Sequence, residues 1–110
     1  IKKVVRLANS LNRNSNIGLV VGATAIDELR IIRNLAPDLP MLIPGVGAQG
    51  GSLEVVAEYG MNSHCGLIVN SSRGIIYASS SKDFIKAARQ KSLELQNKMS
   101  DILKNASLLK

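Results

Sequence analysis

The sequence is poor in several residue types that mark particular classes of protein. One cysteine, Cys65, and no tryptophan occur among its 110 residues, which excludes an internal disulfide framework and a cysteine zinc cluster. No apolar run approaches the ~18 residues of a membrane-spanning helix. The basic residues near the amino terminus are not followed by the apolar core of a secretory signal. We therefore expect a cytoplasmic protein with no membrane partner.

Aromatic side chains are also rare, since only Tyr59, Tyr77 and Phe84 are present. Fourteen basic and eight acidic residues give a net charge of +6, and a basic surface attracts phosphate groups. Proteins that bind single-stranded nucleic acid, however, stack bases on aromatic rings. The basic residues of this chain are scattered, and those near the carboxyl terminus are spaced as on a solvated helix face. The charge therefore does not predict a nucleic-acid partner.

Three short apolar runs alternate with helix-like segments. The runs lie near residues 17–22, 41–44 and 66–70 and so recur about every 25 residues. Such runs are typical of parallel strands that are buried on both faces. Strands and helices that alternate at this spacing predict βαβ units and a parallel sheet, either closed into a barrel or open and doubly wound. With 110 residues, the chain has less than half the ~250 residues of a complete (β/α)₈ barrel.

Local signals predict where the helices begin and end. Thr24, with Asp27 three residues later, resembles a capping box that opens a helix ending before Pro37. Ser52 is the predicted N-cap of the next, short helix. A long amphipathic helix is predicted for about residues 82–104.

The strongest functional signal is PGVGAQGG, residues 44–51, which follows the second apolar run. Its four glycines permit positive φ angles and a close approach of the backbone to a ligand, and the first amides of the next helix favour an anion. Gln49 adds a side-chain amide donor. Arg73 follows the third run at the same predicted sheet edge, and its guanidinium matches phosphate oxygens. These residues predict a phosphate site. The structural alternatives are a tight turn for the glycine-rich segment and a surface salt bridge for Arg73.

Two phosphate-binding folds fit this loop. Gly45, Gly47 and Gly50 satisfy the dinucleotide fingerprint G-x-G-x-x-G between a strand and a helix. Arg73 in place of the usual acid suits the 2′-phosphate of NADP. Two observations count against this interpretation. The fingerprint follows the second predicted strand instead of opening the fold, and Pro44 precedes its first glycine. The other interpretation is a barrel whose last two loops share one phosphate.

Three motifs, in this order and spacing, resemble the last three strands of orotidine 5′-phosphate decarboxylase, most closely the subfamily of many bacteria: GLVVGAT at 18–24, PGVGAQGG at 44–51 and NSSRGIIY at 70–77. The resemblance covers nearly the whole chain. It implies that residues 1–110 are the carboxyl-terminal part of a TIM (β/α)₈ barrel and contain about its last three βα units. The family converts orotidine 5′-monophosphate to uridine 5′-monophosphate (UMP) and CO₂, as a homodimer without a cofactor.

The resemblance also implies roles for individual residues. Gln49 and Arg73 match the side chains that contact the substrate phosphate, and the backbone amides of Ser72 and Arg73 match the donors beside them. Three residues match the lining of the nucleotide site: Pro44, Gly45 and Val46. Much of the family has glycine before this arginine, whereas this chain has Ser72, which leaves the amide in place.

The family's catalytic signature, Asp-x-Lys-x-x-Asp, is absent from these 110 residues. Its lysine protonates the carbanion that CO₂ leaves behind, because an ammonium stabilises the developing negative charge and then delivers a proton. The resemblance places this signature on earlier barrel strands. We therefore expect the chain to hold no catalytic residue and to be inactive alone. The expected partners are the nucleotide, the rest of the barrel and a second subunit.

Two other functions remain open. One is an NADP-binding module of a reductase. The other is a non-catalytic fragment whose unpaired strand edges and apolar faces associate with a partner or with another copy. His64 and Cys65 are neighbours without a third ligand nearby in the sequence, so we expect no metal site.

Overall fold

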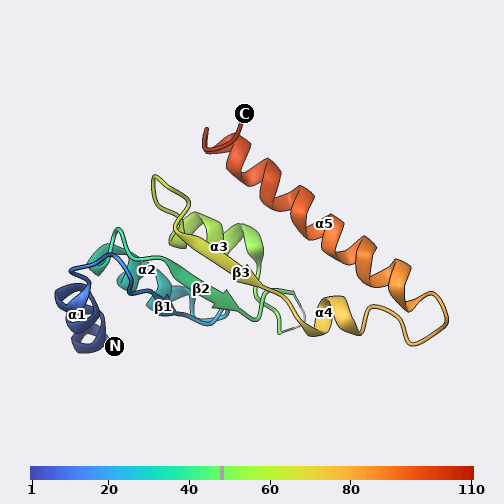
Figure 1. Ribbon diagram of the computed structural model, residues 1–110, viewed down its shortest axis with the longest axis horizontal. Helices are drawn as coiled ribbons and strands as arrows, with labels where there is room; N and C mark the ends of the chain where they lie inside the picture. The colour runs from blue at the N-terminus through green and yellow to red at the C-terminus, as the bar shows by residue number, and fades with distance from the viewer. Residues whose placement is uncertain (48) are drawn as a thin grey trace.

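The computed structural model describes residues 1–47 and 49–110 and contains a three-stranded parallel sheet with helices packed against one of its faces (Figure 1). Ala48, within the glycine-rich segment, lies outside the described residues. The elements in chain order are α1 (Lys2–Leu11), β1 (Leu19–Val20), α2 (Ile26–Leu35), β2 (Met41–Pro44), α3 (Leu53–Gly60), β3 (Leu67–Asn70), α4 (Arg73–Ile76) and α5 (Phe84–Asn105). The strand order β1-β2-β3, with α2 and α3 as connections, confirms the predicted βαβ units.

The strands β2 and β3 occupy the predicted positions, whereas β1 is shorter than the predicted run 17–22. The backbone amides of Leu19, Val21 and Ala23 donate hydrogen bonds of 2.9 Å to carbonyls in and just before β2. Two of the accepting residues are Pro40 and Pro44, which have no N–H to donate back. Pairing is therefore one-sided at both ends of β1, and this shortens the strand.

Only one face of the sheet is buried, so the prediction that the strands are buried on both faces is wrong for this chain. Side chains alternate between the two faces along each strand. On the face that the helices cover, Met41 and Ile43 are fully buried. On the other face, Val20, Leu42 and Ile68 form a row in register and are 70%, 37% and 61% exposed. The chain alone provides helices for one face and leaves the other face open and apolar.

The two predicted helix caps have different outcomes. Ser52 caps α3, because its Oγ accepts a hydrogen bond of 3.3 Å from the Val55 amide. The predicted capping box of Thr24 and Asp27 is wrong, because Ala25 is the residue before α2 and no side chain caps that helix. The chain turns after β1, so the helix begins one residue later than the box requires. Asp27 instead lies in the first turn of α2, where its charge complements the helix dipole.

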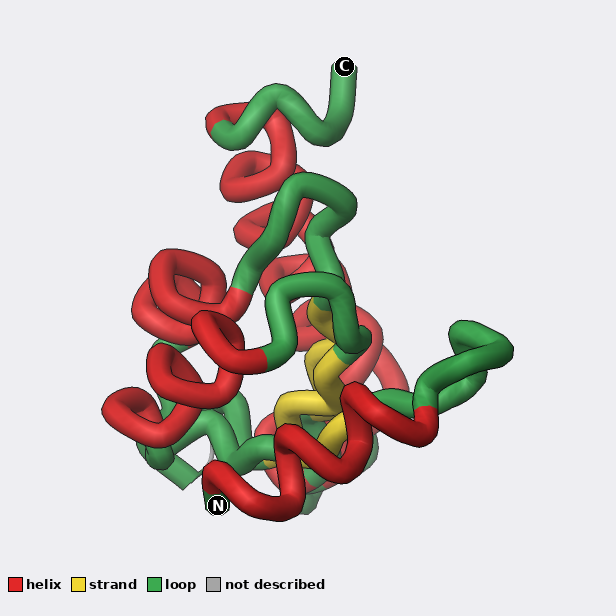
Figure 2. Tube along the Cα trace, turned by 90° about the vertical axis from the view of Figure 1, so that its left-hand side faces the viewer, coloured by secondary structure: helices red, strands yellow, loops and turns green. Residues whose placement is uncertain are grey.

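The helix α5 is the predicted long amphipathic helix, shifted slightly from 82–104, and its apolar stripe is only partly covered. Leu95, Met99 and Ile102 pack against the core, whereas Ile85 near the start of the helix is 69% exposed. Figure 2 shows this helix rising behind the sheet towards the carboxyl terminus at the top of the view. Neither α5 nor any other helix in the described part of the chain is long and apolar enough to cross a membrane.

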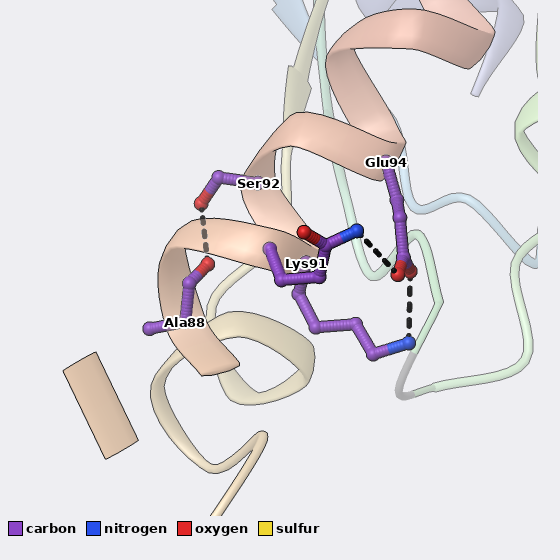
Figure 3. A network of polar contacts seen from close by, with 5 residues as sticks. Ala88, Lys91, Ser92 and Glu94 are labelled. Atoms are coloured by element: carbon purple, nitrogen blue, oxygen red, sulfur yellow. Dashed lines mark hydrogen bonds and ion pairs between the residues drawn. The ribbon is translucent and has the colours of Figure 1, made fainter. Parts of the chain in front are cut away.

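The polar face of α5 carries local contacts between exposed side chains (Figure 3). Lys91 Nζ donates to Glu94 Oε2 over 2.8 Å, and this bond lowers the pKa of the Glu94 carboxyl. Ser92 Oγ donates to the Ala88 carbonyl over 3.0 Å. The basic residues predicted to share a solvated helix face were Lys82, Lys86 and Arg89. All three are exposed, but only Lys86 and Arg89 lie on α5, because Lys82 precedes the helix.

A buried arginine, Arg33, holds the amino-terminal end of the sheet together, and no sequence signal singled it out. Arg33 lies in the last turn of α2 and is only 8% exposed. Its guanidinium donates hydrogen bonds of 2.6 to 3.1 Å to five backbone carbonyls: those of Ala36, Pro37, Leu39, Gly60 and Gly66. Burial lowers its pKa from the ordinary value, and the negative charge of Asp38 opposes this effect. The five carbonyls belong to the ends of α2 and α3 and to the segments before β2 and β3.

Candidate functional site

The carboxyl-terminal ends of β2 and β3 form a small cavity of about 80 Å³. All six residues predicted for the phosphate and nucleotide site line this cavity: Pro44, Gly45, Val46, Gln49, Ser72 and Arg73. They meet because β2 and β3 pair in parallel, with Pro44 opposite Asn70. Asn70 is the seventh lining residue and was not predicted. Its position at the end of the third apolar run, in the motif that contains Ser72, was the signal that could have identified it.

Arg73 brings positive charge to this cavity. It is exposed and begins α4, three residues after Asn70 ends β3. None of the seven described lining residues is acidic. Ion pairs in the described part of the chain join Lys91 to Glu94 and the Lys98 side chain to Glu54, so the salt-bridge alternative for Arg73 finds no partner there. The site therefore suits an anion.

The backbone before α4 adds two amide donors. The short helix α4 was not predicted, and its N-cap residue is Ser72. The Ser72 carbonyl accepts hydrogen bonds from the amides of Ile75 (3.0 Å) and Ile76 (2.9 Å), which fixes this turn of the chain. No acceptor among the described residues takes the amides of Ser72 and Arg73. Both amides can therefore donate to a ligand.

The glycine-rich loop is held by its own hydrogen bonds. Gly45, Gly47 and Gly50 have φ angles of 94°, 87° and 86°, which confirms that the loop needs the conformational freedom of glycine. The Gly47 amide donates to the Gly51 carbonyl (3.0 Å), that of Gly50 to Gly47 (2.8 Å) and that of Gly51 to Gly45 (3.3 Å). Three amides of the loop are thus occupied within the loop itself.

The first residues of α3 do not line this cavity, and the role of their amides in anion binding stays a prediction. On this side of the cavity the described lining residues end at Gln49. The Ser52 hydroxyl already accepts the Val55 amide at the start of α3. Polar groups reach the cavity instead from Gln49 and from the segment 70–73.

Gln49 folds back over Gly45. A Cβ atom placed on Gly45 would lie 2.8 Å from Gln49 Oε1. The Gln49 side-chain amide therefore occupies the space that a side chain at position 45 would need. Gly45 therefore has two roles at the site. Its positive φ allows the turn after β2, and its missing side chain leaves room for Gln49 beside the cavity.

Gly51 packs closely against Ala23, which lies three residues after β1 ends, and this contact leads to a prediction. A Cβ atom on Gly51 would overlap the Cβ of Ala23 and lie 2.8 Å from the Gly45 carbonyl oxygen. Because the loop has to move away to relieve this overlap, we expect Gly51→Ala to lower the free energy of unfolding by about 1–3 kcal/mol. Urea unfolding measures this change, and titration with UMP is expected to show weaker binding.

Gly22→Ala is the matched control, since Gly22 directly precedes Ala23 and no described atom beyond its chain neighbours lies within 4 Å of a Cβ placed on it. We expect its free energy of unfolding to stay within ~0.5 kcal/mol of the parent value. If the two alanine variants lost equal stability, the contact between Gly51 and Ala23 would not be the cause.

His64 and Cys65 lie on the loop before β3, at the end of the sheet opposite to the cavity. His64 Nδ1 lies 3.1 Å from Ser63 Oγ. Within the described ranges, no three His, Cys, Asp or Glu side chains gather in a way that could hold a metal ion.

The chain has relatives among curated proteins, although no family model matches it. It is 45% identical over 108 residues to the orotidine 5′-phosphate decarboxylase of Porphyromonas gingivalis, an alignment that covers 98% of this chain and 39% of the relative. Further relatives with the same name are up to 50% identical. The chain therefore spans about two fifths of the length of the curated relatives it matches, and it matches their carboxyl-terminal portion.

Solved structures show the same similarity. Leishmania donovani UMP synthase matches with a TM-score of 0.70 and 38% identity, over 86% of this chain and 21% of the other. A putative orotidine-monophosphate-decarboxylase from Toxoplasma gondii matches with a TM-score of 0.74 and 28% identity, over 96% of this chain and 42% of the other. These neighbours are TIM barrels, so the α/β fold of this chain is part of such a barrel. The predicted fold class is confirmed.

Proposed function

Because its homologues are orotidine 5′-phosphate decarboxylases matched over their carboxyl-terminal part, we propose that this chain forms the phosphate-binding part of such an enzyme. The intact protein then converts orotidine 5′-monophosphate to UMP and CO₂, as a carboxy-lyase of pyrimidine nucleotide synthesis. One observation carries the proposal. Gln49, Ser72 and Arg73 converge on a single cavity whose described lining has no acidic residue.

Each polar group at the cavity has a defined part in holding the phosphate. The Arg73 guanidinium supplies positive charge and a planar pair of N–H donors that match two phosphate oxygens. The Gln49 side-chain amide and the backbone amides of Ser72 and Arg73 donate to the remaining oxygens. The carboxyl-terminal ends of the strands, where these groups lie, are the usual place for a phosphate in a barrel enzyme.

The phosphate site serves the reaction through binding energy. Interactions with a part of the substrate that does not react can hold the reacting ring in place. In the family, the proton comes from the lysine of Asp-x-Lys-x-x-Asp, a motif absent from these 110 residues. The proposal is therefore that this chain binds phosphate ligands by itself but decarboxylates only with the other barrel strands, and that the complete barrel pairs with a second copy.

The open face of the sheet supports this assignment. Val20, Leu42 and Ile68 are apolar, in register and exposed. They lie on the face opposite to the covering helices, which in a closed barrel is the interior filled by side chains of all eight strands. The remaining strands of a barrel would cover this row.

The hydrogen bonds within the glycine loop disfavour the alternative of an NADP-binding module. The amides of Gly47 and Gly50, which a dinucleotide fingerprint would direct at a pyrophosphate, are bonded within the loop. The decarboxylase relatives agree with this reasoning.

A chimera tests the proposed function. This chain replaces the matched carboxyl-terminal part of the Porphyromonas gingivalis enzyme, to which it is 45% identical over 108 residues. We expect the chimera to release CO₂ from orotidine 5′-monophosphate, and we expect the truncated Porphyromonas enzyme without this part to be inactive. A chimera that unfolds cooperatively and binds UMP but releases no CO₂ would contradict the decarboxylase assignment. A folded chimera that binds NADP but not UMP would favour the alternative.

A further inference from the structure

Asn70 lines the proposed phosphate cavity, although the sequence predicted no role for it there. Asn70 is the last residue of β3 and is exposed on the open face of the sheet. It lines the cavity together with Ser72 and Arg73. Its Nδ2 donates a hydrogen bond of 3.2 Å to Ser72 Oγ. The amide of one lining residue thus orients the hydroxyl of another.

This hydrogen bond decides what the Ser72 hydroxyl can do. A serine hydroxyl has one proton to donate and two lone pairs that accept. Asn70 occupies a lone pair of Ser72 Oγ, so the proton is not used in this contact. No acceptor among the described residues takes that proton, and Ser72 lines the cavity. The proton is therefore available to a phosphate oxygen in the cavity.

We propose that Asn70 is a positioning residue that makes the Ser72 hydroxyl a donor to the phosphate of the ligand. This inference rests on the proposed function, because it adds a donor to the same phosphate site. The ligand class is a phosphate monoester. The site then combines the charge of Arg73, the side-chain amide of Gln49, two backbone amides and one hydroxyl oriented by Asn70.

The backbone at this position does not depend on Asn70. The Ser72 carbonyl is held by the amides of Ile75 and Ile76 in α4, at 3.0 and 2.9 Å. Asn70 and Ser72 are both exposed. Removing the Asn70 amide is therefore expected to leave the thermal unfolding midpoint unchanged, so that its effect on ligand binding can be measured in a folded protein.

A double-mutant cycle tests the pair. NMR titrations of the 110-residue chain with UMP give the Kd of the parent, Asn70→Ala, Ser72→Ala and the double variant. We expect each single substitution to weaken UMP binding about 10-fold, as for one hydrogen bond to a charged group. We expect the double variant to lose about 10-fold as well, and not 100-fold, because both substitutions remove the same donor. Uridine, which has no phosphate, is expected to bind all four proteins equally.

Asn70→Asp is a second variant with nearly the same shape. Its carboxylate accepts the Ser72 proton, which then no longer reaches the ligand, and it adds negative charge beside the phosphate. We expect this variant to bind UMP more weakly than Asn70→Ala does. In the chimera, the same variants are expected to raise KM for orotidine 5′-monophosphate more than they lower kcat.

Three results would overturn the role of Asn70: losses that add up in the double variant, equal losses for UMP and uridine, or an Asn70→Asp variant that binds UMP like the parent. The proposed function is judged separately, on the parent chain. If the parent binds neither UMP nor inorganic phosphate, the phosphate site and the inference both fail. If the parent binds UMP and the Asn70 variants bind it equally well, only the inference fails.

Discussion

Replacing Arg73 with alanine is expected to weaken the binding of UMP about 100-fold. The reason is that the guanidinium and the phosphate would form a bidentate hydrogen bond between two charged groups. Arg73 lines the cavity, and none of the described lining residues is acidic. Arg73→Lys keeps the charge but loses the planar fork, so we expect a loss of only about 10-fold. Calorimetric titration of the chimera with UMP measures both values, and uridine binding is expected to stay unchanged.

Arg89→Ala is the matched control for this prediction. Arg89 is an exposed arginine on α5, and it does not line the cavity. Its replacement removes the same charge from the surface, and screening by salt keeps the effect on UMP affinity within ~2-fold. Equal weakening by Arg73→Ala and Arg89→Ala would mean that UMP responds to net charge and not to a phosphate site at Arg73.

Replacing Arg33 with alanine is expected to have the largest effect on stability. Its guanidinium donates to five backbone carbonyls, and the side chain is 8% exposed. Without Arg33, these buried carbonyls would have no hydrogen-bond donor while still being shielded from water, which destabilises the folded state. We therefore expect a loss of about 3 kcal/mol in the free energy of unfolding, which lowers Tm by more than ~10 °C in a chain of this size. Thermal and urea unfolding of the chain measure it.

Arg30→Ala, three residues earlier on the same helix, is the control for Arg33. Arg30 is exposed, and its guanidinium lies 6.0 Å from the centre of the Tyr59 ring, a contact that contributes ~0.5–1 kcal/mol at exposed sites. Arg33→Lys retains one charged donor group and is expected to fall between Arg33→Ala and the parent. If Arg33→Ala cost no more than Arg30→Ala, the five carbonyl bonds would not hold the sheet.

The cavity at the ends of β2 and β3 was predictable from the sequence, because its residues follow two apolar runs directly. The carboxyl ends of neighbouring parallel strands meet at one sheet edge, so Gln49 after β2 and Arg73 after β3 had to approach each other. The register of β2 and β3, with Pro44 opposite Asn70, shows this approach. The positive φ angles of the loop were also predictable, since glycine at Gly45 and Gly47 is the local signal for them.

Other features depend on contacts between segments that are distant in the sequence. Arg33 bonds to Gly60 and Gly66, which are 27 and 33 residues away, and nothing in the residues around it distinguishes it from a surface arginine. The first residue of α2 depends on how the chain turns after β1. The capping pattern at Thr24 and Asp27 does not predict this turn. The sequence predicted a close approach of the glycine backbone to a ligand, but not that the Gly47 amide donates to the Gly51 carbonyl and the Gly51 amide to the Gly45 carbonyl.

The sequence by itself determined the order of strands and helices, the glycine loop after β2 and the presence of Arg73 at the same edge, because apolar runs, caps and turn residues act over a few positions. Only the tertiary structure decided which groups share the cavity, that Asn70 orients the Ser72 hydroxyl, and that one face of the sheet stays open. The physical reason is that a hydrogen bond or a buried face requires a partner, and the partner's position is set by the packing of the whole chain.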